Sequence, residues 1–303
     1  MLLPEQVGPW NTPPRLLAPI VQAPYAAVRA AALRRSDVVH VHWGKSARLV
    51  RQRGIPRRPY VLSLYGPDLR TRWLDPRLRP ELQRGIDDAS IVCYTDLDTA
   101  DATLAARPDA LHLPQAVDPR IMPPWARQGA NGGHARVVFA SHWSPDKGVT
   151  RQLELVTALH RAYPEVELVG LDWGPGAAEA AARGVRLVPT TDQEDYFDLL
   201  ATADVVVGQA TTILSLSELE AMLIGAPLAA LGQRLPGGDG TAPPTLDGSL
   251  DDVVEQIGEA LADPEGTAQR LGGREWVEAH HHPARIVELL DPLYRRAVAE
   301  WEG

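Results

Sequence analysis

Short runs of β-branched and other apolar residues alternate with segments of helix length along almost the whole chain. These runs cover residues 37–42, 60–65, 90–94, 110–113, 136–140, 165–170, 184–188, 204–208 and 226–231. Strands of that length, separated by segments with helical periodicity, are typical of βαβ units. Because such units join parallel strands, the pattern predicts an α/β fold with parallel sheets.

The length and one break in this pattern indicate more than one domain. A chain of 303 residues exceeds the usual size of one domain. A passage rich in proline and glycine, residues 123–133, separates the first four runs from the rest. We therefore expect a Rossmann-like domain over 1–128, a second over 129–282, and a C-terminal helix over 283–303 that packs back on the first domain.

Lysine is scarce in this chain, since only Lys45 and Lys147 occur among 30 basic residues. Lys147 directly follows the run at 136–140 and precedes a helical pattern in which Val149, Leu153, Val156 and Leu159 share one face. An ammonium at the start of a helix, beyond the end of a parallel strand, lies where α/β folds bind anions. Lys147 is therefore a candidate phosphate-binding residue, although an incidental surface lysine is an equal alternative.

A second helix start has similar features. Ser217 and Glu220 have the spacing of a capping box, and the amides of Ser215, Leu216 and Ser217 precede the helix. Together with Lys147 these amides would hold a diphosphate and stabilise it as it departs. Glu220 could accept hydrogen bonds from a ribose, whereas the structural alternative is that it serves only the cap.

These residues carry a resemblance to glycosyltransferase family 4. The segments 137–148, 169–175, 185–207 and 218–228 are similar, in order and spacing, to its nucleotide-sugar domain, while 37–43, 64–68 and 113–118 resemble the first domain. The resemblance implies the GT-B fold, with two Rossmann-like domains facing a cleft. It also implies retention of anomeric configuration, no metal or other cofactor, and a nucleotide-diphosphate sugar as substrate.

Some donor residues of the family match and others differ. Lys147 occupies the place of the lysine that contacts the donor diphosphate, and Glu220 that of the ribose-binding glutamate. The arginine of the family is His142 here, which is only partly charged near neutral pH. Thr212 replaces the first glutamate, so it could hydrogen-bond a sugar but could not supply a negative charge.

The first domain departs further from the family. Tyr65 replaces the histidine of its "HGxD" turn, while Gly66, Asp68 and Asp118 match their counterparts. On this basis Tyr65 and Asp68, with Lys147 and His142, are the catalytic candidates, and His42, Gly66 and Asp118 are expected on the acceptor side. The alternative for His42 is a structural histidine.

The start of the chain lacks the first strand and glycine-rich loop of the family. Six prolines within residues 1–36 cannot lie in a central strand, so the first domain is expected to be reduced. Residues 15–35 mix apolar residues with arginines and could contact a membrane surface, but Pro19 and Pro24 should interrupt any long helix. Packing between domains is the alternative for this segment.

Charge and cysteine content suggest the compartment and the partners. Residues 1–127 carry 18 basic and 12 acidic residues, a net +6, and residues 128–303 carry 12 and 27, a net −15. The basic part could attract an anionic or lipid-linked acceptor, or could simply be solvated. The single cysteine, Cys93, fits a cytoplasmic protein. We expect no nucleic-acid partner, and peripheral contact with the inner membrane surface is possible through the arginine-rich part. The run 280–282 of three histidines is expected to be a solvated helix start rather than a metal site.

The leading hypothesis is a retaining, metal-independent glycosyltransferase with a reduced GT-B fold. Loss of the first glutamate and of the glycine loop would equally suit a non-catalytic binding or partner subunit. A pseudo-glycosyltransferase that couples a nucleotide-activated cyclitol to an amine is a third possibility.

Overall fold

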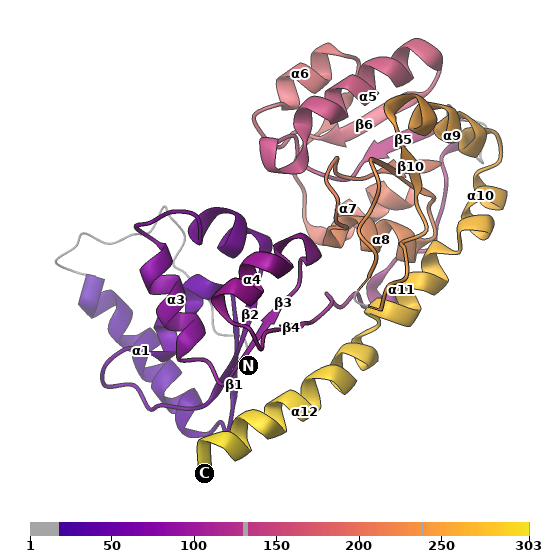
Figure 1. Ribbon diagram of the computed structural model, residues 1–303. Coiled ribbons are helices and arrows are strands. Elements are labelled where there is room, and N and C mark those ends of the chain that lie inside the picture. Colours follow the sequence, from indigo (N-terminus) through magenta and orange to yellow (C-terminus); the bar gives the residue numbers. More distant parts are fainter. Residues whose placement is uncertain (1–17, 130–132, 238, 303) are drawn as a thin grey trace. The chain divides into compact units, whose positions relative to one another are not determined.

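The chain divides into two compact units, each with its own parallel sheet. The computed structural model describes residues 18–129, 133–237 and 239–302 (Figure 1). The first unit comprises the chain up to Pro114 together with residues from Val287 onward, and the second comprises Gln115–Ile286. The predicted α/β class with parallel sheets is confirmed.

The first unit holds four parallel strands in the order β1-β2-β3-β4. They are β1 (Val39–His42), β2 (Tyr60–Leu64), β3 (Ile91–Tyr94) and β4 (Leu111–His112), with helices α1 (Ala18–Arg34), α2 (Ala47–Val50), α3 (Arg79–Asp87), α4 (Ala100–Ala106) and most of α12 (Pro283–Glu302). Strand β2 is buried at all five positions, as expected for a strand covered on both faces. The sheet is small, in agreement with a reduced first domain.

The second unit holds six parallel strands in the order β10-β9-β8-β5-β6-β7. The strands are β5 (Arg136–Phe139), β6 (Glu167–Leu171), β7 (Arg186–Val188), β8 (Val205–Val207), β9 (Leu228–Leu231) and β10 (Leu246–Gly248). The helices are α5 (Val149–Ala162), α6 (Ala177–Ala182), α7 (Gln193–Ala201), α8 (Leu216–Ile224), α9 (Leu250–Ala262), α10 (Pro264–Leu271) and α11 (Gly273–His281). The order is that of a doubly wound α/β sheet.

Alternate residues of the central strands supply two cores, one on each face of this sheet. Val137 and Phe139 pack with residues of α5, α6 and α9, whereas Val138 and Val206 pack with residues of α7, α8 and α11. Side chains of a strand point alternately to its two faces, so a run of valines supplies both cores at once. The predicted apolar stripe of α5 is confirmed, since Leu153, Val156 and Leu159 are buried.

The passage from the first unit to the second lies earlier than the expected boundary at 128/129. Val117 is buried in the core of the second unit, and its amide donates to the carbonyl of His281 at 2.9 Å. The Trp125 indole donates to the carbonyl of Ala203 at 2.8 Å. The proline-rich segment therefore packs on the second unit instead of linking two units.

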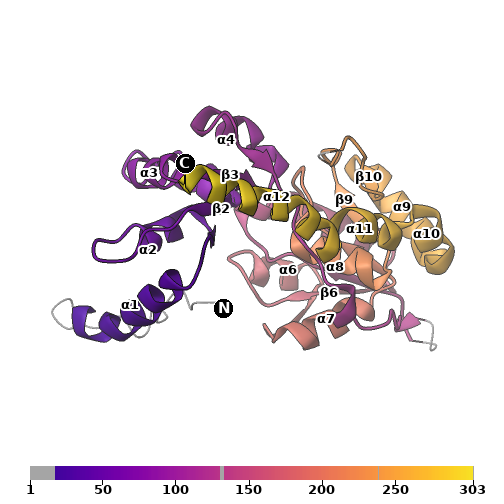
Figure 2. The same ribbon diagram turned by 90° about the horizontal axis from the view of Figure 1, so that it is seen from below.

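Two local expectations were wrong. Pro19 and Pro24 lie within α1, a single helix of 17 residues (Figure 2). Pro19 falls in the first turn, where its missing N–H has no helical acceptor, and Pro24 removes one further hydrogen bond without ending the helix. The histidine run does not begin a helix, because His280 and His281 end α11 and His282 is its C-cap residue. No helix among the described residues is long and apolar enough to cross a membrane.

Candidate functional site

The order of strands in the second unit defines where a ligand binds. The chain runs from β5 outward to β6 and β7 on one side, then returns to β8, β9 and β10 on the other. The loops that follow β5 and β8 therefore lead to opposite sides of the sheet, which makes this a topological switch point. Open α/β sheets bind ligands in the crevice at the carboxyl ends of the strands at such a point. Lys147 follows β5, and the start of α8 follows β8.

Backbone contacts hold the Lys147 loop against the loop after β8. The Ala210 amide donates to the Lys147 carbonyl at 3.0 Å. Gly148 has a φ of +73°, and a Cβ there would lie 2.6 Å from the Ala210 carbonyl oxygen, so no other residue fits. Within the described chain, the half-buried Lys147 side chain has no hydrogen bond or ion pair. Its ammonium is thus available to a ligand at the switch point between β5 and β8.

The helix start after β8 differs from the predicted capping box. Ser215 is the N-cap and Glu218 the residue that closes the box, whereas Ser217 and Glu220 lie inside α8. The Ser215 amide donates to Glu218 Oε2 at 2.6 Å, so it is not available to a phosphate. Among the described residues, the amides of Leu216 and Ser217 have no acceptor and remain available.

Glu220 lacks the structural task that its sequence position suggested. Its side chain keeps 6% of its surface exposed, and burial raises the pKa of its carboxyl to about 7. In the part of the chain that the structure describes, the carboxyl has no hydrogen bond or ion pair. Tyr196, whose hydroxyl donates to the Ala140 carbonyl at 2.7 Å, lies close to Glu220. A carboxyl in a largely buried residue near Tyr196, with no hydrogen bond of its own in the described chain, can accept hydrogen bonds from a ligand.

A buried ion pair fixes the loop that carries Thr212. Arg234 Nη2 lies 3.5 Å from Glu218 Oε1, and both side chains are at most 1% exposed. The same guanidinium donates to the carbonyls of Gln209 at 2.6 Å and Ile213 at 3.1 Å, and also to that of Thr211. Thr212, at the exposed centre of this loop, is held on both sides by its neighbours. The sequence alone gave no indication of Arg234.

His142 contacts an aromatic residue that the sequence analysis did not single out. Its ring stacks on Trp173, with 4.6 Å between centroids, and Trp173 lies in the loop after β6. Burial lowers the pKa of His142, Lys147 adds to the effect, and Asp146 opposes it. His142 is therefore largely neutral near pH 7 and offers a hydrogen bond rather than a charge.

In the first unit, two histidines and a tyrosine gather at the ends of β1 and β2. The rings of His40 and His42 stack with 4.3 Å between centroids, and His42 Nδ1 lies 2.7 Å from the Tyr65 hydroxyl. Burial, and then the charge of His42, lower the pKa of His40 to about 4. Trp43 adopts a φ of +72°, which is uncommon for a residue with a side chain, and its ring stacks on Tyr65. Backbone strain of this kind clusters at functional sites.

Asp68 and Gly66 hold this cluster together. Asp68 is 1% exposed and accepts hydrogen bonds from the amides of Gly44 at 2.8 Å and Tyr65 at 3.2 Å. Burial raises the pKa of Asp68 in spite of those two amides. Gly66 donates to Asp96 Oδ2 at 3.0 Å, and a Cβ on it would collide with Arg70. Both residues position the Tyr65 loop and present no reactive group to solvent.

Asp118 belongs to a different unit from the other acceptor-side candidates. It belongs to the second unit, where it caps the short helix Pro119–Ile121 and pairs with Arg120 at 2.7 Å. That arginine lowers the pKa of Asp118 to about 2. Its carboxylate is occupied by a local turn, so nothing in its surroundings favours the expected acceptor-side role.

The histidines of the run 280–282 have structural partners. His280 pairs with Asp239 at 2.9 Å and stacks on Trp276, and His281 Nδ1 lies 2.8 Å from the Gln115 carbonyl oxygen. No group of three or more metal-ligating side chains occurs among the described residues.

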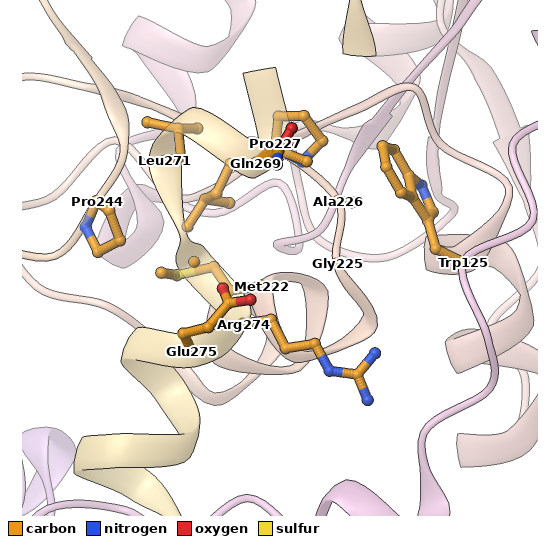
Figure 3. Close-up of a pocket in the computed structure, with 13 residues that line it drawn as sticks. Trp125, Met222, Gly225, Ala226, Pro227, Pro244, Gln269, Leu271, Arg274 and Glu275 are labelled. Atoms are coloured by element: carbon orange, nitrogen blue, oxygen red, sulfur yellow. The ribbon is translucent and has the colours of Figure 1, made fainter. Parts of the chain in front are cut away.

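The second unit also contains a cavity of about 230 Å³ that lies away from Lys147. Trp125, Met222, Pro227, Leu271 and Arg274 contribute to its wall (Figure 3). Pro227 immediately precedes β9 and Gly225 caps the end of α8, so the cavity lies at the amino edge of the sheet. Lys147 and the start of α8 follow the carboxyl edge instead.

Comparison with solved structures identifies the fold. Sucrose-phosphate synthase from Thermosynechococcus elongatus superposes with a TM-score of 0.67 at 19% identity, over 97% of this chain and 82% of that one. Anabaena HepE in complex with UDP and glucose gives 0.70 at 16%, over 93% and 83%. A UDP-forming α,α-trehalose-phosphate synthase from Burkholderia vietnamiensis gives 0.68 at 15%, over 94% and 78%. No protein-family model matches the sequence, and no curated protein matches it either.

The chain therefore has the GT-B fold of these glycosyltransferases. In agreement with this, its second unit has the doubly wound strand order. At these identities the likeness is one of fold, so the chemistry has to be argued from the site itself.

Proposed function

We propose that this protein is a glycosyltransferase that moves a sugar from a nucleotide-diphosphate donor to an acceptor. One observation carries the proposal: Lys147, which forms no hydrogen bond or ion pair among the described residues, the unused amides of Leu216 and Ser217, and the largely buried Glu220 follow the carboxyl ends of β5 and β8. The similar fold of Anabaena HepE, which was solved with UDP and glucose, adds support.

Each of these groups has a task in sugar transfer. Lys147 and the two amides place positive charge where the donor diphosphate lies, so they stabilise the charge that develops as the diphosphate departs. His142 adds a neutral hydrogen-bond donor, and Glu220 accepts from the ribose hydroxyls. Because these groups supply the electrostatic stabilisation, we propose that transfer proceeds without a metal and, as the family resemblance implies, with retention of configuration.

The acceptor is proposed to bind at the first unit. His42 and Tyr65 lie at the carboxyl ends of β1 and β2, where a ligand of a parallel sheet would lie. The net charge of residues 34–84, with 13 basic and 4 acidic residues, favours an anionic or lipid-linked acceptor. A chain with one buried cysteine suits the cytoplasm, and we place the activity there, in peripheral contact with the inner membrane surface.

Removal of the Lys147 ammonium tests the donor site. Because hydrogen bonds to charged groups contribute about 1.5–3 kcal/mol, Lys147→Ala should weaken binding of UDP, or of whichever nucleoside diphosphate binds, by roughly 10- to 150-fold in calorimetry. Lys45→Ala, which removes the other lysine, serves as the control and should leave the affinity unchanged. Equal affinities of Lys147→Ala and the unaltered protein would exclude the assignment.

Turnover needs its own measurement. The purified protein is incubated with a panel of nucleotide sugars and candidate acceptors, and release of nucleoside diphosphate is followed with and without a chelator. Sustained release that the chelator does not reduce, with an NMR spectrum showing the donor anomeric configuration in the product, is the expected result. Nucleotide binding without release in any combination would indicate a binding subunit.

A further inference from the structure

Trp173 is an exposed aromatic residue beside the proposed donor site. It keeps 54% of its surface exposed, although its ring stacks on His142 from the Lys147 loop. The residue lies in the loop after β6, and β6 is the neighbour of β5 on the side away from β8. A ligand held at Lys147 would meet the indole on one side and the start of α8 on the other.

Contacts with the buried Trp143 hold the loop that carries Trp173. Its carbonyl accepts a hydrogen bond of 2.9 Å from the amide of Trp143, which is fully buried, and the Trp143 indole donates to the Leu171 carbonyl at 3.0 Å. Gly174 has a φ of +108°, and a Cβ there would lie 2.5 Å from the Trp143 carbonyl oxygen. The indole is therefore an exposed apolar surface on a fixed support, which costs little ordering when it binds a ligand.

We propose that Trp173 is the nucleobase platform of the donor site, on which the base of the bound nucleotide stacks. The inference rests on the proposed function, because it needs a nucleotide at Lys147. The diphosphate occupies Lys147 and the start of α8, so the part of the ligand that extends over β6 is one of its two ends. A nucleobase is planar and aromatic, so it can lie flat on an indole.

Stacking of this kind contributes affinity without selecting one base. Aromatic stacking on a base contributes about 1–3 kcal/mol when measured by alanine substitution, and every base has a π-face. His142 covers one face of the indole, so a base would stack on the opposite, exposed face. Selection among bases would then depend on hydrogen bonds from other loops.

The test measures the base and the phosphates separately. Calorimetry gives the affinities of the unaltered protein, Trp173→Ala and Trp173→Phe for UDP, ADP and GDP. The affinity of each protein for inorganic pyrophosphate is measured by competition with the nucleotide that binds. Trp173→Ala should weaken nucleotide binding by roughly 5- to 150-fold and leave pyrophosphate within about twofold. Trp173→Phe keeps an aromatic face and should recover most of the affinity.

Two further measurements separate binding from damage to the fold. Trp301→Ala removes an indole that is 52% exposed on α12 and should leave nucleotide affinity unchanged. Nucleotide should quench tryptophan fluorescence in the unaltered protein, and Trp173→Phe should lose that quenching.

Several outcomes overturn the inference alone. One is unchanged nucleotide affinity in Trp173→Ala, and another is an equal loss of nucleotide and pyrophosphate. A loss confined to the nucleotide sugar, with the nucleoside diphosphate unaffected, would assign Trp173 to the sugar instead. If the unaltered protein binds no nucleoside diphosphate, whatever its base, the proposed function fails together with the inference.

Discussion

At the scale of single residues, Glu220 shows most directly how the site depends on its surroundings. The residue is largely buried near Tyr196 and makes no hydrogen bond or ion pair in the described chain, and burial raises the pKa of its carboxyl from the ordinary 4.5 to about 7. Without a ligand the Glu220 carboxyl makes no hydrogen bond to the described chain, so its position is better explained by ligand binding than by stability. A site that keeps such a group trades stability for binding.

This carboxyl makes the stability of the protein depend on pH. The folded chain holds the Glu220 proton more tightly than the unfolded chain does, so this contribution to stability is fully present below pH 4.5 and is lost as the pH rises through about 7. Compared with Glu220→Gln, the unaltered protein should lose on the order of 3 kcal/mol of unfolding free energy between pH 4.5 and pH 8. Chemical denaturation of both proteins at the two pH values provides the measurement.

An exposed glutamate provides the control for this effect. Glu259→Gln changes a solvent-exposed carboxyl on α9 and should produce no comparable difference between the two pH values. A constant difference in stability between Glu220→Gln and the unaltered protein at pH 4.5 and pH 8 would contradict the account. Bound nucleotide should reduce the loss at high pH, since ribose hydroxyls donate to the ionised carboxylate.

The sequence selected candidate site residues but could not predict which local contacts each one makes. Lys147 and Glu220 were selected by spacing and by the scarcity of lysine, and both lie at the carboxyl edge of the second sheet. Ser215/Glu218 and Ser217/Glu220 have the same capping-box spacing, so the sequence could not decide between them. The choice depends on Arg234, which pairs with Glu218 across the loop.

At the scale of elements, the contact between the loops after β5 and β8 organises the site. Gly148 is the point of closest approach, because it combines a positive φ with a backbone neighbour at 2.6 Å from its virtual Cβ. Gly54 has a similar φ of +80° but nothing within 4 Å. A comparison of substitutions at Gly54 and Gly148 therefore distinguishes the cost of a left-handed backbone from the cost of a steric collision.

Alanine at these two positions should have different effects. Gly54→Ala meets only the left-handed backbone penalty and should cost about 1–2 kcal/mol of unfolding free energy. Gly148→Ala also forces the two loops apart, so it should cost about 2–5 kcal/mol and weaken nucleotide binding. Denaturation and calorimetry on both variants check this, and equal losses of stability with unchanged affinity would contradict it.

Most strands could be predicted because their apolar runs are compatible with a buried parallel strand and with few alternatives. Long apolar runs such as 136–140 and 204–208 supply both faces of a buried parallel strand, and nine of these runs became strands. β10 was missed because its three residues, Leu246–Gly248, offer no apolar run. The stacking of Trp173 on His142 joins two loops and leaves no local pattern, so it could not be predicted from either segment.

At the scale of the whole molecule, the two units differ in charge. The second unit, residues 115–286, carries 12 basic and 24 acidic residues, a net −12, which leaves 18 and 15, a net +3, for the rest of the chain. An anionic partner is therefore attracted to one unit and repelled by the other. This difference favours an acceptor at an anionic membrane surface.

Binding to lipid vesicles tests that proposal. The protein should sediment with phosphatidylglycerol vesicles at low salt, release as salt screens the charges, and remain in solution with phosphatidylcholine vesicles. Arg77→Glu, on the first unit, should weaken this binding by about tenfold, while Arg161→Glu, on the second, should not. Identical behaviour of the two variants, or binding that salt does not change, would contradict the proposal.

The two lysines have a chemical consequence. Guanidinium groups resist ordinary acylating reagents at neutral pH, so a chain with twenty-eight arginines offers electrophiles only two side-chain amines. Lys147 is one of them, and its ammonium forms no hydrogen bond or ion pair among the described residues. Acylation of Lys147 would remove the positive charge on which the proposed diphosphate site depends.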